Sequence, residues 1–170
     1  MSNLRFMSAA VAAATLAAAA AVHAQTASTA TGNLRVQATV LSECAVQDST
    51  LDFGQVSSTP PAQPPQTDIR ITCTAGVPFT VGIGDGENAS SGQRRMLRQG
   101  GSGSQAGDYL AYELYQEIGL ANRWGDAVVA ERVSGTGTGS TQTKPVFGKL
   151  VASTPSSGNF VDNAVITLHF

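Results

Sequence analysis

Few residues in this chain have the types and spacing that enzyme chemistry needs. His169 alternates with apolar residues near the C-terminus, and no serine or cysteine lies in a recognisable nucleophile setting. A nucleophile needs a base positioned beside it, and the sequence indicates no such pairing. The sequence therefore predicts a protein that is not an enzyme and that has no catalytic residue.

Two overlapping clusters are weak candidates for ligand binding. Gly82, Gly84 and Gly86 alternate along the chain, whereas a phosphate-binding loop has a different spacing and leads into a helix. Asp85 and Glu87 offer oxygens to calcium, but the ligand count is low and the spacing of an EF-hand loop is absent. We expect a flexible hairpin turn here, and we expect neither a cofactor nor a metal ion.

Cys44 and Cys73 are the only cysteines. In an exported protein a single pair favours a disulfide. The bond would close a loop of about 30 residues, and the chain-entropy model gives it a stabilisation on the order of 3–4 kcal/mol. A metal-binding pair is the alternative, but two thiols without a nearby histidine do not complete a tetrahedral zinc site.

The first 24 residues have the features of an export signal. Arg5 provides a positive charge, residues 9–22 are almost entirely Ala, Val and Leu, and Val22-His23-Ala24 resembles a cleavage site. An uncleaved membrane anchor is the alternative, but the apolar run is shorter than the roughly 20 residues that a spanning helix needs. We expect cleavage after Ala24, which leaves a single domain of roughly 145 residues.

The charge balance argues against two classes of partner. Without Arg5, the mature chain has nine basic residues (ten less one) and 12 acidic residues, a net charge of −3. No basic stripe is available to hold nucleic acid, and no excess of Lys and Arg accompanies an apolar helix. We therefore expect no nucleic-acid binding and no membrane insertion.

The last stretch, residues 158–170, has the alternation of a half-buried β-strand. One face carries Ala164, Ile166, Leu168 and Phe170, and the other carries Val165, Thr167 and His169. We expect this strand to end the protein, with no further strand after it. An unpaired strand exposes a row of N–H and C=O groups, so it needs a neighbour from elsewhere.

Other short segments show the same period of two. Residues 33–41 place Leu34, Val36, Ala38 and Val40 on one face, after a small, polar leader at 25–32. Further strands are expected at 51–53, 67–74, 77–83, 94–98, 109–116 and 144–151, and a loop followed by a strand is expected between 124 and 133. A proline-rich loop is expected at 59–65. Eight or nine short strands, with no convincing helix after the signal, predict an antiparallel β-sandwich.

Several motifs occur in the order seen in one known family. They are Cys44, Leu51-Asp52-Phe53-Gly54, residues 73–79, Arg95-Met96-Leu97, residues 109–115, Trp124-Gly125, Phe147-Gly148 and residues 158–162. They span nearly the whole mature chain, which resembles the spore coat protein U-like domain. Phe160 departs from the pattern, because the family often has tyrosine there. The family includes subunits of archaic chaperone–usher pili of Gram-negative bacteria.

The resemblance implies an all-β fold, an incomplete immunoglobulin-like β-sandwich that lacks its final strand and is completed by donor-strand addition. A periplasmic chaperone would fill the gap first, and the N-terminal segment of the next pilus subunit would then replace it at an outer-membrane usher. The chain would pass through the periplasm to the cell surface as part of a pilus, for attachment or biofilm formation.

The resemblance also assigns roles to residues within the expected pilin domain, residues 33–170. Donor knobs would lie in a strand at 33–41, and an acceptor groove and chaperone-binding edge would lie along the last strand. The donor residues are Leu34, Val36, Ala38 and Val40, and the groove residues are Ala164, Ile166, Leu168 and Phe170.

Three alternatives remain open. Residues 33–41 can be the domain's own first strand instead of a donor. The chain can be a secreted surface or spore-coat protein with the same fold that forms no fibre. It can also be a carbohydrate-binding module in which Trp124 and the tyrosines stack on sugars.

Overall fold

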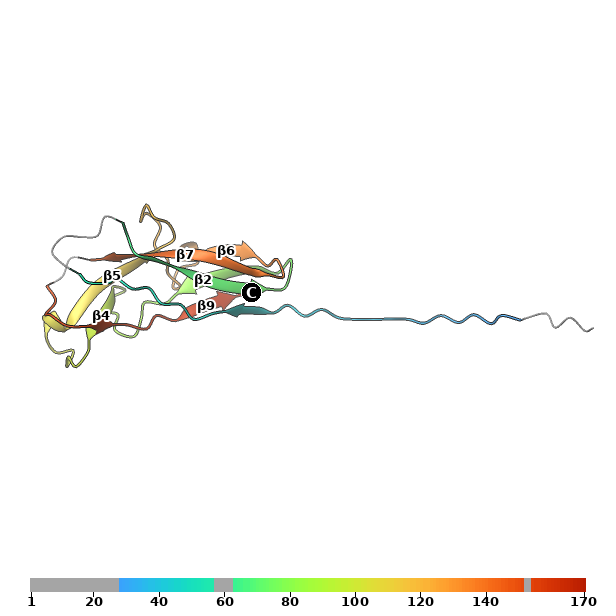
Figure 1. The fold of residues 1–170 in the computed structure, drawn as a ribbon, viewed down its shortest axis with the longest axis horizontal. Helices are drawn as coiled ribbons and strands as arrows, with labels where there is room; N and C mark the ends of the chain where they lie inside the picture. The colour runs from blue at the N-terminus through green and yellow to red at the C-terminus, as the bar shows by residue number, and fades with distance from the viewer. Residues whose placement is uncertain (1–27, 57–62, 152–153) are drawn as a thin grey trace, which may run out of the picture. The chain divides into compact units, whose positions relative to one another are not determined.

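The computed structural model describes residues 28–56, 63–151 and 154–170, whose strands form two antiparallel sheets (Figure 1). The chain divides into two units, residues 1–38 and 39–170, and all the described strands lie in the second. The expected signal peptide, residues 1–24, and part of the proline-rich loop lie outside the described residues. No helix in the described part of the chain is long and apolar enough to cross a membrane.

The larger sheet has six strands in the order β1-β2-β7-β5-β4-β8. Their bounds are β1 (Cys44–Val46), β2 (Gln66–Cys73), β4 (Arg94–Arg98), β5 (Tyr109–Tyr115), β7 (Thr141–Leu150) and β8 (Phe160–Val161). The central pairing joins β2 to β7, from Gln66 opposite Phe147 to Thr72 opposite Thr141. These two strands run side by side in Figure 1, whereas β1 and β8 form the edges.

The smaller sheet has the order β6-β3-β9. Its strands are β3 (Pro78–Ile83), β6 (Val133–Thr136) and β9 (Ile166–His169). Two short 3₁₀ helices, η1 (Ala106–Asp108) and η2 (Val129–Glu131), complete the regular structure of the described residues. The prediction of an antiparallel all-β sandwich with eight or nine strands is therefore confirmed.

The core is built mainly from β2, β3 and β5. Each of three strands buries one face, and the nine side chains concerned are Ile69, Ile71 and Cys73 of β2, Phe79, Val81 and Ile83 of β3, and Leu110, Tyr112 and Leu114 of β5. Trp124 also lies in this core, with 0% of its surface exposed, and its Nε1 donates a hydrogen bond to the Val81 carbonyl at 2.9 Å. Trp124 is therefore not available to stack on a sugar.

Residues 33–41 form no strand, so that expectation is wrong for the fold of this chain. No helix or strand is present from residue 28 to residue 43. Leu34, Val36 and Val40 are 89%, 81% and 81% exposed. A strand is stabilised by backbone pairing and packing against neighbouring strands, and this segment pairs with no described strand, although the Leu41 carbonyl accepts a side-chain hydrogen bond from Thr74.

Residues 51–53 also differ from expectation, since they do not form a strand. Leu51 and Phe53 are instead half-buried and pack against the core. They lie over Gly148 of β7, where an added Cβ would come within 2.6 Å of Leu51 Cδ2 and 2.7 Å of Phe53 Cζ. The absence of a side chain at Gly148 makes room for this pair on the inner face of the larger sheet.

The single strand expected over residues 158–170 is in fact two strands in different sheets. β8 pairs with β4, through Leu97 opposite Val161, whereas β9 pairs with β3. Between them the chain crosses from one sheet to the other. The sequence alternation correctly assigned the faces of β9, but it gave no sign of the crossing.

Candidate strand-acceptor site

The last strand, β9, has one side of its backbone unpaired among the described residues. It lies at the edge of the smaller sheet and pairs only with β3, with Ile83 opposite Ile166. Gly84 N donates to Val165 O at 2.9 Å, so Val165 directs its backbone groups toward β3. Because these directions alternate along an antiparallel strand, Ile166 and Leu168 direct their N–H and C=O groups away from it.

The first strand, β1, has the same property. It pairs only with β2 within the described residues, and its flanking bonds run from Thr74 N to Glu43 O at 2.9 Å and from Gln47 N to Arg70 O at 3.0 Å. By the same alternation, Cys44 and Val46 direct their backbone groups away from β2. Cα atoms of β1 and β9 approach within 8 Å, yet the two strands belong to different sheets.

The four side chains predicted to line a groove differ in their burial and in their contacts. Ala164, Ile166 and Leu168 are half-buried and pack against the core cluster. Phe170 is 63% exposed and follows the end of β9. It lines a hollow of about 490 Å³ together with the β1–β2 disulfide region and Gly139. The structure thus groups the first three and places Phe170 at the end of the strand.

Other half-buried apolar side chains pack on the same core and were not singled out from the sequence as site residues. They are Val46, Leu51, Phe53, Met96 and Leu150. Only tertiary contacts reveal this set. The one local indication is that Val46 shares a strand face with Cys44, two residues earlier in the sequence. Like Ile166 and Leu168 of β9, each residue of this set packs against the core cluster and is covered only in part by the described chain.

Asp126 holds β9 from its outer side. Its Oδ1 lies 2.9 Å from His169 Nε2 and 2.9 Å from Arg132 Nε. Burial acts to raise the pKa of Asp126, but hydrogen bonds from His169 and Thr167 and the charge of Arg132 outweigh it, so the pKa lies below its usual value. His169 therefore has a structural partner on the outer face of the strand.

A buried arginine ties the two sheets together near the start of β9. The guanidinium of Arg94, which is 0% exposed, pairs with Glu113 and donates to the carbonyls of Ile83 at 2.6 Å, Gly84 at 2.9 Å and Trp124 at 2.8 Å. Gly84 is the residue whose N–H bonds to Val165. The sequence indicated only a short basic strand here, without a sign that one arginine is buried.

The crossing between β8 and β9 is held by Asp162. Its Oδ2 accepts a hydrogen bond from Tyr112 Oη at 2.7 Å, and its Oδ1 accepts one from Asn88 Nδ2 at 2.9 Å. Burial and the bond to Asp162 raise the pKa of Tyr112 well above its usual value, so the hydroxyl keeps its proton. Gly86 has φ of +90°, and a Cβ there would collide with the Asp162 carboxylate.

The acidic residues considered for calcium have protein partners. Asp85 Oδ1 lies 2.5 Å from Arg123 Nη2, and Glu87 Oε2 accepts a bond from Asn163 Nδ2 at 3.1 Å. In the described part of the chain, no group of three or more His, Cys, Asp or Glu side chains is placed to hold a metal ion.

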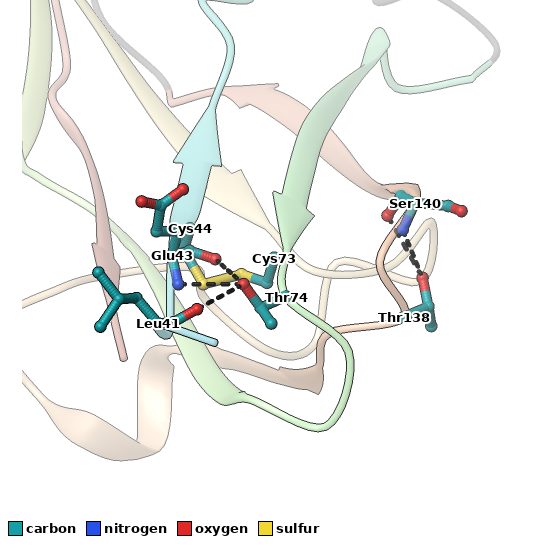
Figure 2. Close-up of a disulfide and its surroundings, with 7 residues drawn as sticks. All are labelled: Leu41, Glu43, Cys44, Cys73, Thr74, Thr138 and Ser140. Atoms are coloured by element: carbon teal, nitrogen blue, oxygen red, sulfur yellow. Dashed lines mark hydrogen bonds between the residues drawn. A yellow bond between two sulfur atoms is a disulfide. The ribbon is translucent and has the colours of Figure 1, made fainter. Parts of the chain in front are cut away.

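Cys44 and Cys73 form a disulfide, which confirms the predicted pairing. They lie opposite each other in the β1–β2 ladder. Thr74 adds hydrogen bonds at the same point, since its Oγ1 donates to the Leu41 carbonyl at 3.3 Å and accepts from Glu43 N at 3.2 Å (Figure 2). The chain leading into β1 is therefore held both covalently and by hydrogen bonds.

These features define the class of protein: an all-β, immunoglobulin-like sandwich. Its edge strands β1 and β9 present backbone groups that no other described strand pairs with, and partly buried apolar side chains lie on both strands. The model of the Spore Coat Protein U domain matches residues 30–167. The chain belongs to this family. Comparison with the curated proteins gives no match.

Comparison with solved structures supports the fold. A chain of the CsuC–CsuE chaperone–tip adhesion subunit pre-assembly complex, from archaic chaperone–usher Csu pili of Acinetobacter baumannii, aligns with TM-score 0.59 and 23% identity. The alignment covers 78% of this chain and 40% of that one, so this chain spans less than half of its length. A chaperone–tip adhesin complex of CFA/I fimbriae biogenesis aligns with TM-score 0.34 and 13% identity over 62% of this chain and 34% of that one, which is too distant to argue from.

Proposed function

We propose that this protein is a structural subunit of a chaperone–usher pilus of the archaic type, completed by a strand from another molecule. The observation that carries the proposal is the pair of edge strands β1 and β9. Cys44 and Val46 on one, and Ile166 and Leu168 on the other, direct backbone groups to the side where no described strand pairs with them. A strand added there would gain main-chain hydrogen bonds on both sides.

The added strand separates β1 from β9 as it enters. Strands in a sheet lie about 4.8 Å apart, so a strand paired on both sides needs about 9–10 Å between its neighbours. Cα atoms of β1 and β9 now approach within 8 Å. The apolar residues that would be covered include Ala164, Ile166 and Leu168, which are only half-buried in this chain.

Residues 33–41 supply the donor strand of the next molecule. Leu34, Val36 and Val40 are more than four-fifths exposed and, with Ala38, alternate with polar residues. Burying a Leu or Val side chain contributes roughly 1.5–3 kcal/mol, so several such knobs make a durable joint. Pairing of this kind joins different surfaces of successive copies and does not close on itself, so it propagates as a filament.

The partners and the route follow from this role. Residues 1–24 direct export and are removed, residues 25–32 form a short leader, of which 25–27 lie outside the described residues, and residues 33–170 are the pilin domain. A periplasmic chaperone first occupies the edge of β9. The fold neighbour was solved in a chaperone–subunit complex, which supports a chaperone as a partner. An outer-membrane usher then exchanges it for the donor strand of the next subunit. The product is a surface pilus that serves attachment or biofilm formation.

Deletion of residues 25–40 tests the proposal. The shortened protein, expressed with its signal peptide and its periplasmic chaperone, should still co-purify with the chaperone because β9 is intact. It should form no polymers that resist denaturant, because the donor knobs are gone. A non-fibrous coat protein of the same fold would show no polymer even from the full chain. Polymer that is unchanged by the deletion would exclude residues 33–41 as the donor.

A further inference from the structure

The proposed donor segment leads directly into β1 at the Cys44–Cys73 disulfide. Cys44 is the first residue of β1 and the fourth residue after Val40, the last proposed donor knob. We infer that the Cys44–Cys73 disulfide receives the tension exerted by a neighbouring molecule and transfers it from β1 to β2. This inference rests on the proposed function, since it takes residues 34–40 as the segment that a neighbour holds.

On its own, β1 is poorly suited to resist a pull. It has three residues, pairs only with β2 among the described strands, and is only partly buried. A force entering from the N-terminal side first reaches the bond from Thr74 N to Glu43 O and later the bond from Gln47 N to Arg70 O. A single backbone hydrogen bond in water adds little stability, and bonds loaded one after another break singly.

The disulfide lies next to the first of these bonds. Cys44 and Cys73 face each other across the β1–β2 ladder, immediately beyond the pair formed by Glu43 and Thr74. Figure 2 shows the sulfur–sulfur bond beside the hydrogen bond that Thr74 donates to the Leu41 carbonyl and the one that it accepts from Glu43 N. Tension that enters through Leu41 therefore reaches a covalent bond before it has loaded the rest of β1.

The strand on the far side of the bond is among the best supported in the molecule. β2 has eight residues and is flanked by β1 and β7. Its pairing with β7 runs over nearly its whole length, and Ile69, Ile71 and Cys73 are at most 1% exposed. Force applied at Cys73 must disrupt the centre of the larger sheet instead of its edge.

Transfer of force from β1 to β2 protects two contacts between molecules at once. β1 follows the chain's own donor segment, and it also forms one side of the place where the next molecule's strand is proposed to enter. If β1 separated from β2, residues 44–65 would lengthen by up to about 75 Å at roughly 3.4 Å per residue. The acceptor site would lose one of its sides in the same event. With the disulfide intact, only the short link at residues 41–43 can extend.

Single-molecule pulling on the mature chain tests this inference. Handles are attached at the N-terminus and after Phe170, and the oxidised chain is compared with the Cys44→Ser/Cys73→Ser double variant. The variant should show an early lengthening at low force, of up to about 75 Å, before the remaining domain unfolds. The oxidised chain should lack that step. An identical first event in both proteins would overturn the inference.

Two further measurements separate force transfer from general stability. The native chain is also folded with its disulfide intact and reduced in the instrument, so a failure of the variant to fold does not decide the result. In a second geometry the N-terminal handle is moved to an azide-bearing residue at exposed position 68 of β2, which bypasses β1. Here oxidised and reduced chains should begin to unfold at the same force. An equal loss of force in both geometries would show general weakening and would refute the inference.

The pulling result is independent of polymerisation, because it is measured on single molecules. Failure of the proposed function would appear instead as a full chain that forms no polymer in the presence of its chaperone, and failure of the donor assignment as polymer that survives deletion of residues 25–40.

Discussion

His169 Nε2 lies 2.9 Å from Asp126 Oδ1, which joins the outer face of the last strand to the segment that precedes η2. Asp126 occupies the space above Gly82 of β3, where any Cβ would collide with its carboxylate. β9 is thus held by β3 along one backbone edge and by Asp126 from outside, while its other edge pairs with no strand among the described residues. The proposed acceptor edge is therefore supported by contacts that leave its backbone groups uncovered.

Replacing Asp126 with Asn should reduce the dependence of stability on acid pH. The folded-state pKa of Asp126 is lowered, so the carboxylate contributes stability above its unfolded pKa of about 3.9, and this is lost as pH falls through the folded value. We expect Asp126→Asn to lose about 1 kcal/mol at pH 7, and the two proteins to converge in stability as the pH falls below the lowered folded-state pKa of Asp126. Urea unfolding of the two proteins between pH 2.5 and 7 measures the loss of stability at pH 7 and the convergence in acid. Asp68→Asn, an exposed change on β2, should behave like the native protein.

Replacing Arg94 with Leu should be among the most damaging single changes. It leaves Glu113 without one of its cationic partners and leaves the Ile83 and Trp124 carbonyls without a donor. Breaking a buried pair in this way costs about 3–5 kcal/mol. The lower end is expected, because Arg123 Nε still lies 3.0 Å from Glu113. The measurement is the free energy of unfolding in urea.

Arg95 provides the control for that prediction. It is the next residue of β4, and its guanidinium carbon lies 4.0 Å above the Tyr109 ring. Arg95→Leu removes the same charge and should cost no more than about 1 kcal/mol. Equal losses for the two variants would contradict the role assigned to Arg94.

Comparing alanine variants of two glycines distinguishes the cost of backbone strain from the cost of a collision with Asp162, which lies between β8 and β9. Gly86 and Gly76 have φ of +90° and +83°, but a Cβ at Gly86 meets the Asp162 carboxylate whereas one at Gly76 meets nothing within 4 Å. Gly76→Ala should cost about 1–2 kcal/mol of unfolding free energy, from strain alone. Gly86→Ala should cost at least about 2 kcal/mol more, because it also displaces Asp162 from Tyr112. Thermal melts of the two variants give the comparison, and equal losses would show that the Asp162 contact has little effect.

Val36 and Gln37 give a matched test of the donor assignment. They are adjacent in the chain, and only Val36 lies on the proposed knob face. Val36→Asp should abolish polymer, because a carboxylate would have to enter an apolar site. Gln37→Asp should leave polymer formation largely unchanged. Electrophoresis of undenatured polymer measures both, and the same result from the two variants would argue against the assigned face.

A chain that carries its own donor should stop at the monomer. Adding a second copy of residues 33–41 after Phe170, on a flexible linker, makes strand insertion intramolecular at an effective concentration on the order of millimolar. The fusion protein should be soluble without the chaperone and should melt at a higher temperature than the native monomer. A fusion with Ser at the four knob positions should show neither effect. Thermal denaturation and size-exclusion chromatography give the result.

The sequence by itself determined which faces of the main strands are buried. In β2, β3 and β5, alternate residues of the sequence are buried, because side chains on a strand point to opposite sides with a period of two and burial follows that local geometry. The pairing of Cys44 with Cys73 was also predictable, since an exported chain with two cysteines offers one intramolecular disulfide.

Only the tertiary structure decided which strand lies beside which. It divided residues 158–170 between two sheets, left residues 33–41 without a strand, and placed Leu51 and Phe53 over Gly148. It also buried Arg94, which local sequence gives no reason to distinguish from Arg95. Strand pairing and the burial of a charge depend on groups far apart in the sequence, so local periodicity carries no information about them.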